Sequence, residues 1–249
     1  RDIESRVACE VLTTTGLVLV AGEVSTDGYS DIPSVVRKTL KKIGYTNPEY
    51  GLDYQDCSVL ISVHEQSANI SIGVTQTEDR EQGAGDQGLM FGYASNETDV
   101  LMPLPITLAH RLSKRLADVR KEGILPWTRP DGKSQVSVLY EDDRPVRVDK
   151  VVIAIQHDHD VDNEKIHNEI EKEVILPICE DWLHEDTQFL INSTGVFEKG
   201  GPEADTGLTG RKIIVDTYGG TGRHGGGAFS GKDPSKVDRS ASYMARDRA

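Results

Sequence analysis

The stretch RVACEVLTTTGLVLVAGEV, residues 6–24, sets the fold class of this 249-residue chain. It holds two runs rich in β-forming residues, 6–13 and 17–24, on either side of Thr14, Thr15 and Gly16. Two such runs around a short turn with glycine predict a β-hairpin. Further strands are predicted at 58–63, 136–140, 150–156, 189–192 and 212–218, and helices at 31–43, 103–122 and 163–175. Strand pairs interrupted by helices indicate an α+β fold rather than a regularly alternating parallel sheet.

Capping and breaking residues predict where the helices begin and end. Asp31 can cap the first helix, with Pro33 in its first turn, and Gly44 ends it. The helix that begins at Asn163 is predicted to stop at Pro177, because proline cannot continue the backbone hydrogen bonding of a helix.

The composition excludes several classes of protein. Apolar residues make up 37% and charged residues 28%, which is typical of a globular chain rather than a disordered one. No run approaches the ~18 apolar residues of a membrane span. The three cysteines are scattered, which excludes a disulfide framework and a CxxC metal site and points to a reducing, cytoplasmic compartment. The net charge of −13 argues against a nucleic-acid partner.

One segment departs from this acidic character. Residues 209–239 hold six Lys or Arg and three Asp, and 219–231 hold seven glycines. Arg223, Lys232 and Lys236 are spaced through this segment. Backbone amides free of side chains, together with spaced cations, suit a polyphosphate, so we predict phosphate binding here. The alternative is a flexible surface linker.

Two familiar phosphate motifs fit this loop only in part. Residues 220–225 match GxGxxG, but more glycine follows where a dinucleotide fold needs the start of a helix. Residues 226–232 match GxxxxGK, but the next residue is Asp233, where a P-loop needs Ser or Thr. We therefore reject both the dinucleotide fold and the P-loop.

Two polar clusters could also carry function. Gly83–Gly88, GAGDQG, places small residues on both sides of Asp86, which suits close approach of a ligand or, equally, a tight turn. His157–Asp160, HDHD, lies between a strand and a helix cap. Alternate residues of an extended chain point opposite ways, so we interpret this second cluster as a polar loop rather than a metal site.

The sequence resembles a known family through two motifs. GAGDQG and GGGAFSGKDPSKVDRSA, residues 83–88 and 225–241, resemble the two signature motifs of S-adenosylmethionine synthetase, bacterial type. The resemblance also runs through DQGLMFGYA, DGKSQV and GLTGRKIIVDTYGG. It implies three α+β domains related by pseudo-threefold symmetry. It also implies synthesis of S-adenosylmethionine from ATP and L-methionine, Mg²⁺ and K⁺ as cofactors, and dimers or dimers of dimers with shared active sites.

The resemblance also implies a domain organisation. It assigns 1–69 to an N-terminal-type domain, 70–81 to a mobile active-site loop, 82–199 to a central domain and 201–249 to a C-terminal domain. The chain shows no counterpart of the family's His-Pro-Asp-Lys segment, of its K⁺-binding glutamate, or of most of its third domain. We therefore expect the chain to be truncated at both ends and residues 1–249 alone to be nearly inactive.

The resemblance assigns roles position by position. It gives methionine binding to Glu23, Gln66, Asp205 and Lys236; ATP binding to Asp131, Lys133, Phe197, Asp205, Arg211, Lys212, Ala228 and Lys232; a divalent metal to Asp238; and catalysis to Lys232, Arg211, Lys236 and Asp86. Two positions depart from the family pattern, since Gly132 stands where Ala is common and Val196 where Arg is common.

The implied reaction is attack of the methionine sulfur on the ribose 5′ carbon, with release of phosphate and pyrophosphate. A thioether needs no deprotonation, so catalysis should rest on alignment and on stabilisation of the leaving triphosphate. Two alternatives stay open: another phosphate-handling enzyme, such as an ATPase or kinase, and a non-catalytic nucleotide-binding fragment. Methionine-independent ATP turnover would favour an ATPase or kinase.

Overall fold

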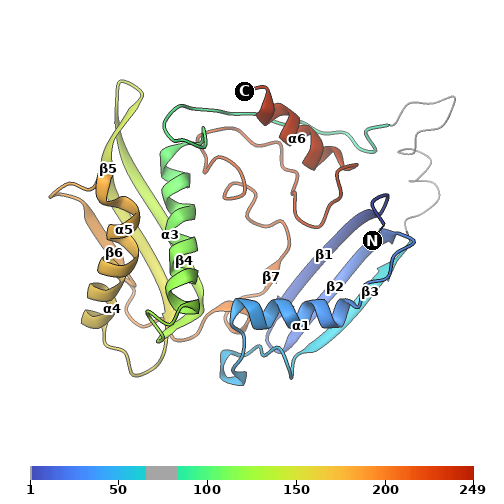
Figure 1. Ribbon diagram of the computed structural model, residues 1–249, viewed down its shortest axis with the longest axis horizontal. Coiled ribbons are helices and arrows are strands. Elements are labelled where there is room, and N and C mark those ends of the chain that lie inside the picture. Colours follow the sequence, from blue (N-terminus) through green and yellow to red (C-terminus); the bar gives the residue numbers. More distant parts are fainter. Residues whose placement is uncertain (1, 66–82) are drawn as a thin grey trace.

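The computed structural model describes residues 2–65 and 83–249 (Figure 1). Two mixed β-sheets, each covered on one face by helices, form the two ends of the molecule. A largely irregular C-terminal segment runs between them (Figure 1). The predicted α+β class is confirmed. In the described part of the chain, no helix has both the length and the apolar character needed to cross a membrane.

The N-terminal sheet has the strand order β3-β2-β1-β7. Strands β1 and β2 form the predicted antiparallel hairpin, whereas β3 runs parallel to β2. Helix α1 lies across this sheet (Figure 1). The Asp31 side chain caps the N-terminus of α1, and Gly44 ends the helix in a left-handed conformation, both as predicted. The elements are β1 (Arg6–Thr14), β2 (Leu17–Ser25), α1 (Ile32–Ile43), a 3₁₀ turn (Pro48–Tyr50) and β3 (Ser58–His64).

The two faces of the N-terminal sheet differ because side chains alternate along a strand. Val18 and Val20 are buried in one cluster with Leu40 of α1, so the even residues of β2 face the helix. The odd residues, including Glu23, therefore line the opposite face. This second face is the one that bears on function.

The central unit packs helices on a sheet of order β4-β5-β6. Its core joins Leu108, Leu112 and Leu116 of α3 to Val151, Ile153 and other buried residues of the sheet and of the later helices. The elements are α3 (Leu104–Lys121), β4 (Thr128–Glu141), β5 (Arg144–His157), α4 (Asn163–Ile170), a π-helical turn (Glu171–Ile175), α5 (Leu176–Cys179), a 3₁₀ turn (Glu180–Trp182) and β6 (Gln188–Ile191).

The predicted stop at Pro177 is wrong. The helix that begins at Asn163 passes through a π-helical turn at Glu171–Ile175 and continues into α5, where Pro177 lies in the first turn. Proline leaves the carbonyl four residues earlier without its helical donor. That carbonyl belongs to Glu173, and the Nε of Arg115 in α3 donates to it at 2.8 Å. A neighbouring helix therefore supplies the hydrogen bond that proline removes.

The C-terminal segment contains a 3₁₀ turn (Gly201–Glu203), β7 (Gly207–Leu208) and α6 (Val237–Asp247). The strand predicted at 212–218 is wrong, because residues 209–220 form a series of turns. The backbone hydrogen bonds of this stretch are local: the Asp216 amide donates to the Lys212 carbonyl, and the Gly219 amide donates to the Ile214 carbonyl. A strand needs a neighbour, and the free edge of β1 pairs with other parts of this segment.

Candidate anion-binding site

Two parts of the C-terminal segment dock one after the other on the same edge of β1. At one half of the strand, β7 pairs with Leu12 and Thr13, and the Thr209 amide donates to the Val11 carbonyl at 2.9 Å. At the other half, the Cys9 amide donates to the Gly231 carbonyl at 2.8 Å. The edge of β1 therefore gathers residues near 205–209 and near 231–236, which hold three of the predicted ligand-binding positions, Asp205, Lys232 and Lys236.

A row of side chains crosses the N-terminal sheet from this edge. Lys232 forms an isolated antiparallel bridge with Ala8, Ala8 lies opposite Glu23, and Glu23 lies opposite His64. Residues opposite one another on neighbouring strands point to the same face. Lys232 and Glu23 therefore share the face that α1 does not cover. Glu23 also lies 3.4 Å from the Nε2 atom of His64.

Each lysine of the glycine-rich motif is paired with an aspartate of the same motif. The Nζ atom of Lys232 lies 2.7 Å from Oδ2 of Asp238, and that of Lys236 lies 2.5 Å from Oδ2 of Asp233. The two pairs are nested along the chain. Both lysine side chains are 21% exposed, whereas the aspartates differ, at 27% for Asp238 and 7% for Asp233. The Lys232 pair is therefore the more open to solvent and to ligands.

Asp233 is the most constrained carboxylate of the site. Burial by itself raises its pKa, but hydrogen bonds from the Lys236 ammonium and from the Ser235 and Val7 backbone outweigh burial. The net result is a pKa well below the usual range, so Asp233 carries a negative charge. A carboxylate with several such donors is stabilised in its charged form.

The two glycine-rich signature loops meet at close backbone contacts. A Cβ atom at position 225 would lie 1.4 Å from the Leu89 carbonyl oxygen, so only glycine allows this approach. A Cβ atom at position 227 would lie 2.3 Å from Oδ1 of Asp238. A Cβ atom at position 88 would lie 3.9 Å from the same oxygen. The end of the first loop therefore lies beside Asp238 of the second.

A second group of predicted residues lies where the central sheet meets the C-terminal segment. Oδ2 of Asp131 accepts a hydrogen bond from the Gly201 amide at 2.8 Å. Phe197 is held by His157, whose Nε2 accepts from the Phe197 amide at 3.0 Å and whose own amide donates to the Phe197 carbonyl. Lys133 is exposed on β4, opposite Ala154 of β5.

This junction also constrains its neighbours. A Cβ atom at position 200 would lie 2.9 Å from both Asp131 and Phe197, so the backbone passes directly beside the two predicted ATP contacts. Tyr45 lies against Gly201, and its pKa is raised to about 12, first by burial and then by the charge of Asp131. Gly201 leads within a few residues to Asp205, which connects this group with the edge of β1.

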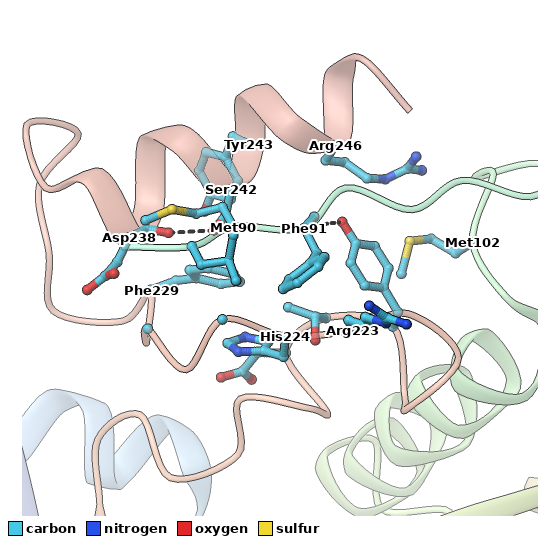
Figure 2. A pocket seen from close by; sticks show the side chains of 16 residues that line it. Met90, Phe91, Met102, Arg223, His224, Phe229, Asp238, Ser242, Tyr243 and Arg246 are labelled. Atoms are coloured by element: carbon cyan, nitrogen blue, oxygen red, sulfur yellow. Dashed lines mark hydrogen bonds between the residues drawn. The ribbon is translucent and has the colours of Figure 1, made fainter. Parts of the chain in front are cut away.

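A cavity of about 150 Å³ lies beside the motif (Figure 2). Figure 2 shows Phe91, Phe229 and Tyr243 around it, with Asp238 at one edge. Two predicted residues line it: Asp238, to which the family resemblance assigns a metal, and Arg223, one of the cations expected to bind phosphate. The cavity and the predicted site therefore touch at these two residues, and Lys232 and Lys236 lie outside the cavity lining.

Some predicted residues are not brought into these groups. Asp86 is exposed, and its carboxylate accepts from the amide of its neighbour Gln87. Arg211 and Lys212 are exposed on the turns that follow β7. Gln66 and the predicted mobile loop, 70–81, lie outside the described residues.

Two residues that hold the site together were not predicted. Asp233 entered the sequence argument only as the residue that rules out a P-loop, because its partner Val7 is 226 positions away. His157 was assigned to a polar loop, yet it ends β5 with 2% exposure and positions Phe197. A buried histidine at a strand end has no local sequence signal, so neither contact could be read from the pattern.

The Asp238 carboxylate suits a divalent metal ion that a bound ligand also coordinates. Mg²⁺ commonly binds one or two carboxylates together with substrate phosphates. Oδ1 of Asp238 faces the bare backbone at Gly227, where a Cβ atom would fill the space. Within residues 2–65 and 83–249, no group of three or more His, Cys, Asp or Glu side chains could hold a metal alone. The Asp238 carboxylate therefore suits a Mg²⁺ ion that is shared with an anionic ligand.

The fold and the site together define an α+β protein whose glycine-rich, lysine-bearing loop docks on a sheet edge. Three family models match consecutive parts of the chain: the N-terminal domain of S-adenosylmethionine synthetase at residues 1–68, its central domain at 81–197 and its C-terminal domain at 199–249. The chain belongs to the S-adenosylmethionine synthetase family, as the two signature motifs predicted.

A curated relative supports the same assignment. The chain is 57% identical, over 256 residues, to a protein of Clostridium acetobutylicum named S-adenosylmethionine synthase. The match covers 99% of this chain and 66% of the relative. The chain therefore spans slightly less than two thirds of that relative's length.

Proposed function

We propose that the intact protein makes S-adenosylmethionine from ATP and L-methionine, with release of phosphate and pyrophosphate. One observation carries the proposal. Two separate C-terminal segments dock on one edge of β1 and bring Lys232 into the same row as Glu23. A cation suited to phosphate and a carboxylate suited to an ammonium group thus lie on one face of one sheet.

The residues of this chain act mainly by binding and orientation. Glu23 attracts the ammonium group of methionine, and the lysines of the motif face the triphosphate. The methionine sulfur then attacks the ribose 5′ carbon without losing a proton, and the bond from that carbon to the triphosphate oxygen breaks. Negative charge grows on the leaving triphosphate in that step, so Lys232 and Lys236 stabilise the transition state more than the bound substrate. Water afterwards hydrolyses the released triphosphate to phosphate and pyrophosphate.

The adenosine part of ATP is assigned to the second group. Phe197 offers an aromatic face to the base, and Asp131 and Lys133 approach from β4. Asp205 and Arg211 lie between the two groups along the chain. The hydrogen bond from the Gly201 amide to Asp131 ties the two groups together.

Two cofactors accompany this proposal. Mg²⁺, held by Asp238 and the substrate phosphates, would neutralise phosphate charge. Asp238 is paired with Lys232, so the same carboxylate serves a lysine and a metal. K⁺ is proposed from family membership, and none of the residues above is assigned to it.

We further propose self-association through the open face of the N-terminal sheet. Leu208, Leu12, Leu19 and Leu60 lie opposite one another in a single row across four strands. The two outer leucines, Leu208 and Leu60, are 44% and 54% exposed. A second copy of the chain could bury this row. Sedimentation of the intact protein tests this, and the Leu60→Lys variant should shift it toward monomer.

Activity is tested by mixing the intact protein with ATP and L-methionine and measuring S-adenosylmethionine, phosphate and pyrophosphate. We expect all three products in equal amounts, and no phosphate release when methionine is left out. ATP hydrolysis at an unchanged rate without methionine would instead support an ATPase. Nucleotide binding with no turnover of any kind would support a non-catalytic role.

A further inference from the structure

Asp233 joins the glycine-rich motif to the N-terminal sheet. Its backbone amide donates to the Val7 carbonyl at 3.1 Å, and Oδ2 of its side chain accepts from the Val7 amide at 2.6 Å. Oδ1 accepts from the Ser235 amide at 2.8 Å, and Oδ2 also accepts from the Lys236 ammonium at 2.5 Å. One carboxylate therefore binds strand β1 through Val7, the following turn through Ser235, and the ammonium group of Lys236.

The burial of Asp233 shows how it can act. Its side chain is 7% exposed, and both oxygens already accept hydrogen bonds. A ligand that approaches this edge of β1 therefore meets Lys236, which is 21% exposed, rather than Asp233. Any influence of Asp233 on a ligand passes through Lys236 or through the backbone at Lys232.

We propose that Asp233 is a positioning residue that fixes the Lys236 ammonium at the edge of β1, where it meets the anionic substrate. The role in turnover rests on the proposed function, whereas the fixed position of Lys236 does not. A lysine side chain has a flexible four-carbon stem, so a single charged partner decides where its ammonium group lies. Misplacement of such a group by about 1 Å can cost ~10²-fold in rate.

The first test measures the position of Lys236 without any turnover. An amine-reactive N-hydroxysuccinimide ester labels the folded intact protein, and mass spectrometry gives the rate at each lysine. Asp233→Asn should raise labelling of Lys236 several-fold. The matched control is Asp118→Asn. Asp118 forms an ion pair with Lys114, which is far from Lys236 along the chain. The control should leave Lys236 unchanged, and an unchanged Lys236 rate in Asp233→Asn overturns the proposal.

The second test separates positioning from general support of the fold. The kcat for S-adenosylmethionine formation is measured for Asp233→Asn, Lys236→Met and the double variant. If Asp233 acts through Lys236, each single change lowers kcat about 10²-fold and the double variant loses no more than the worse single one. Losses that multiply in the double variant overturn the proposal. If labelling succeeds but no variant or wild-type protein makes product, the proposed function fails and the position of Lys236 stands.

A third measurement needs no variant and applies if Asp233→Asn does not fold. In the unmodified protein, Lys232 and Lys236 are equally exposed, but the partner of Lys236 is the more buried carboxylate. A buried pair is less screened by solvent and salt. Lys236 should therefore label more slowly than Lys232. Equal or faster labelling of Lys236 contradicts the proposal.

Discussion

Replacing Gly231 with alanine should detach the glycine-rich motif from β1. Gly231 has a φ of +78°, and a Cβ atom there would lie 1.8 Å from the Cys9 carbonyl oxygen. An L-residue in this left-handed conformation costs about 1–2 kcal/mol. The collision also separates the motif backbone from β1. This separation removes the hydrogen bonds from the Cys9 amide to the Gly231 carbonyl and from the Asp233 amide to the Val7 carbonyl. At about 1 kcal/mol for each hydrogen bond, these add ~2 kcal/mol.

The loop provides a matched control for this change. Gly226 also has a positive φ, of +105°, but a Cβ atom there has nothing within 4 Å. Gly226→Ala should therefore show only the conformational cost, and Gly231→Ala should be less stable than it by about 2 kcal/mol. Urea unfolding followed by circular dichroism measures the difference in the free energy of unfolding.

Hydrogen exchange locates the effect. Peptides that contain Cys9 should exchange faster in Gly231→Ala and at the native rate in Gly226→Ala, because only the first change breaks the hydrogen bond that the Cys9 amide donates to the Gly231 carbonyl. Equal stability of the two variants, with unchanged exchange at Cys9, would refute the docking of the motif on β1.

Three further predictions concern catalysis and stability. Lys232→Ala should lower kcat by ~10²-fold while changing the KM for methionine little, because its cation faces the leaving group; an unchanged kcat with a raised KM for ATP would show uniform binding. Arg115→Leu should reduce the free energy of unfolding by about 1–3 kcal/mol in urea, since it leaves the Glu173 carbonyl without a donor; Arg111→Leu, on the exposed side of the same helix, should change it little, and equal losses would contradict this. Asp233 has a lowered pKa, so its stabilisation is complete above the ordinary carboxylate pKa of about 3.9 and is lost below it. The stability advantage of wild type over Asp233→Asn should therefore begin to shrink below about pH 5 and keep shrinking as pH falls toward the lowered pKa, and a constant difference would contradict that.

Local patterns predicted the regular elements well. The hairpin at 6–24 and the capped helix between Asp31 and Gly44 follow from periodicity and from helix-ending residues, whereas the strands predicted at 136–140 and 150–156 are shorter than β4 and β5. These signals act between residues close in sequence, so a single chain carries them. The sequence alone therefore predicts the fold class.

The errors arose where a distant residue decides the structure. Pro177 does not stop its helix, because Arg115 of another helix satisfies the carbonyl that proline leaves without a donor. Residues 212–218 have β-forming side chains, but a strand needs a free neighbour, and β1 pairs with other segments. Local propensity does not contain either contact.

The candidate site shows the same division. Its lysines and glycines stand out in the sequence by composition and by resemblance to family motifs. What the sequence does not reveal is that Lys232 lies in one row with Glu23, or that each motif lysine is already paired with an aspartate. These relations depend on the docking of the C-terminal segment on β1, which joins residues more than two hundred positions apart.

A structure of the intact protein with L-methionine and a non-hydrolysable ATP analogue tests the central claim most directly. We predict that the triphosphate contacts the ammonium groups of Lys232 and Lys236 at the edge of β1, with methionine beside Glu23 on the same face of the sheet. Nucleotide bound instead in the cavity between Phe91 and Tyr243, with the edge of β1 free of ligand, would contradict the account.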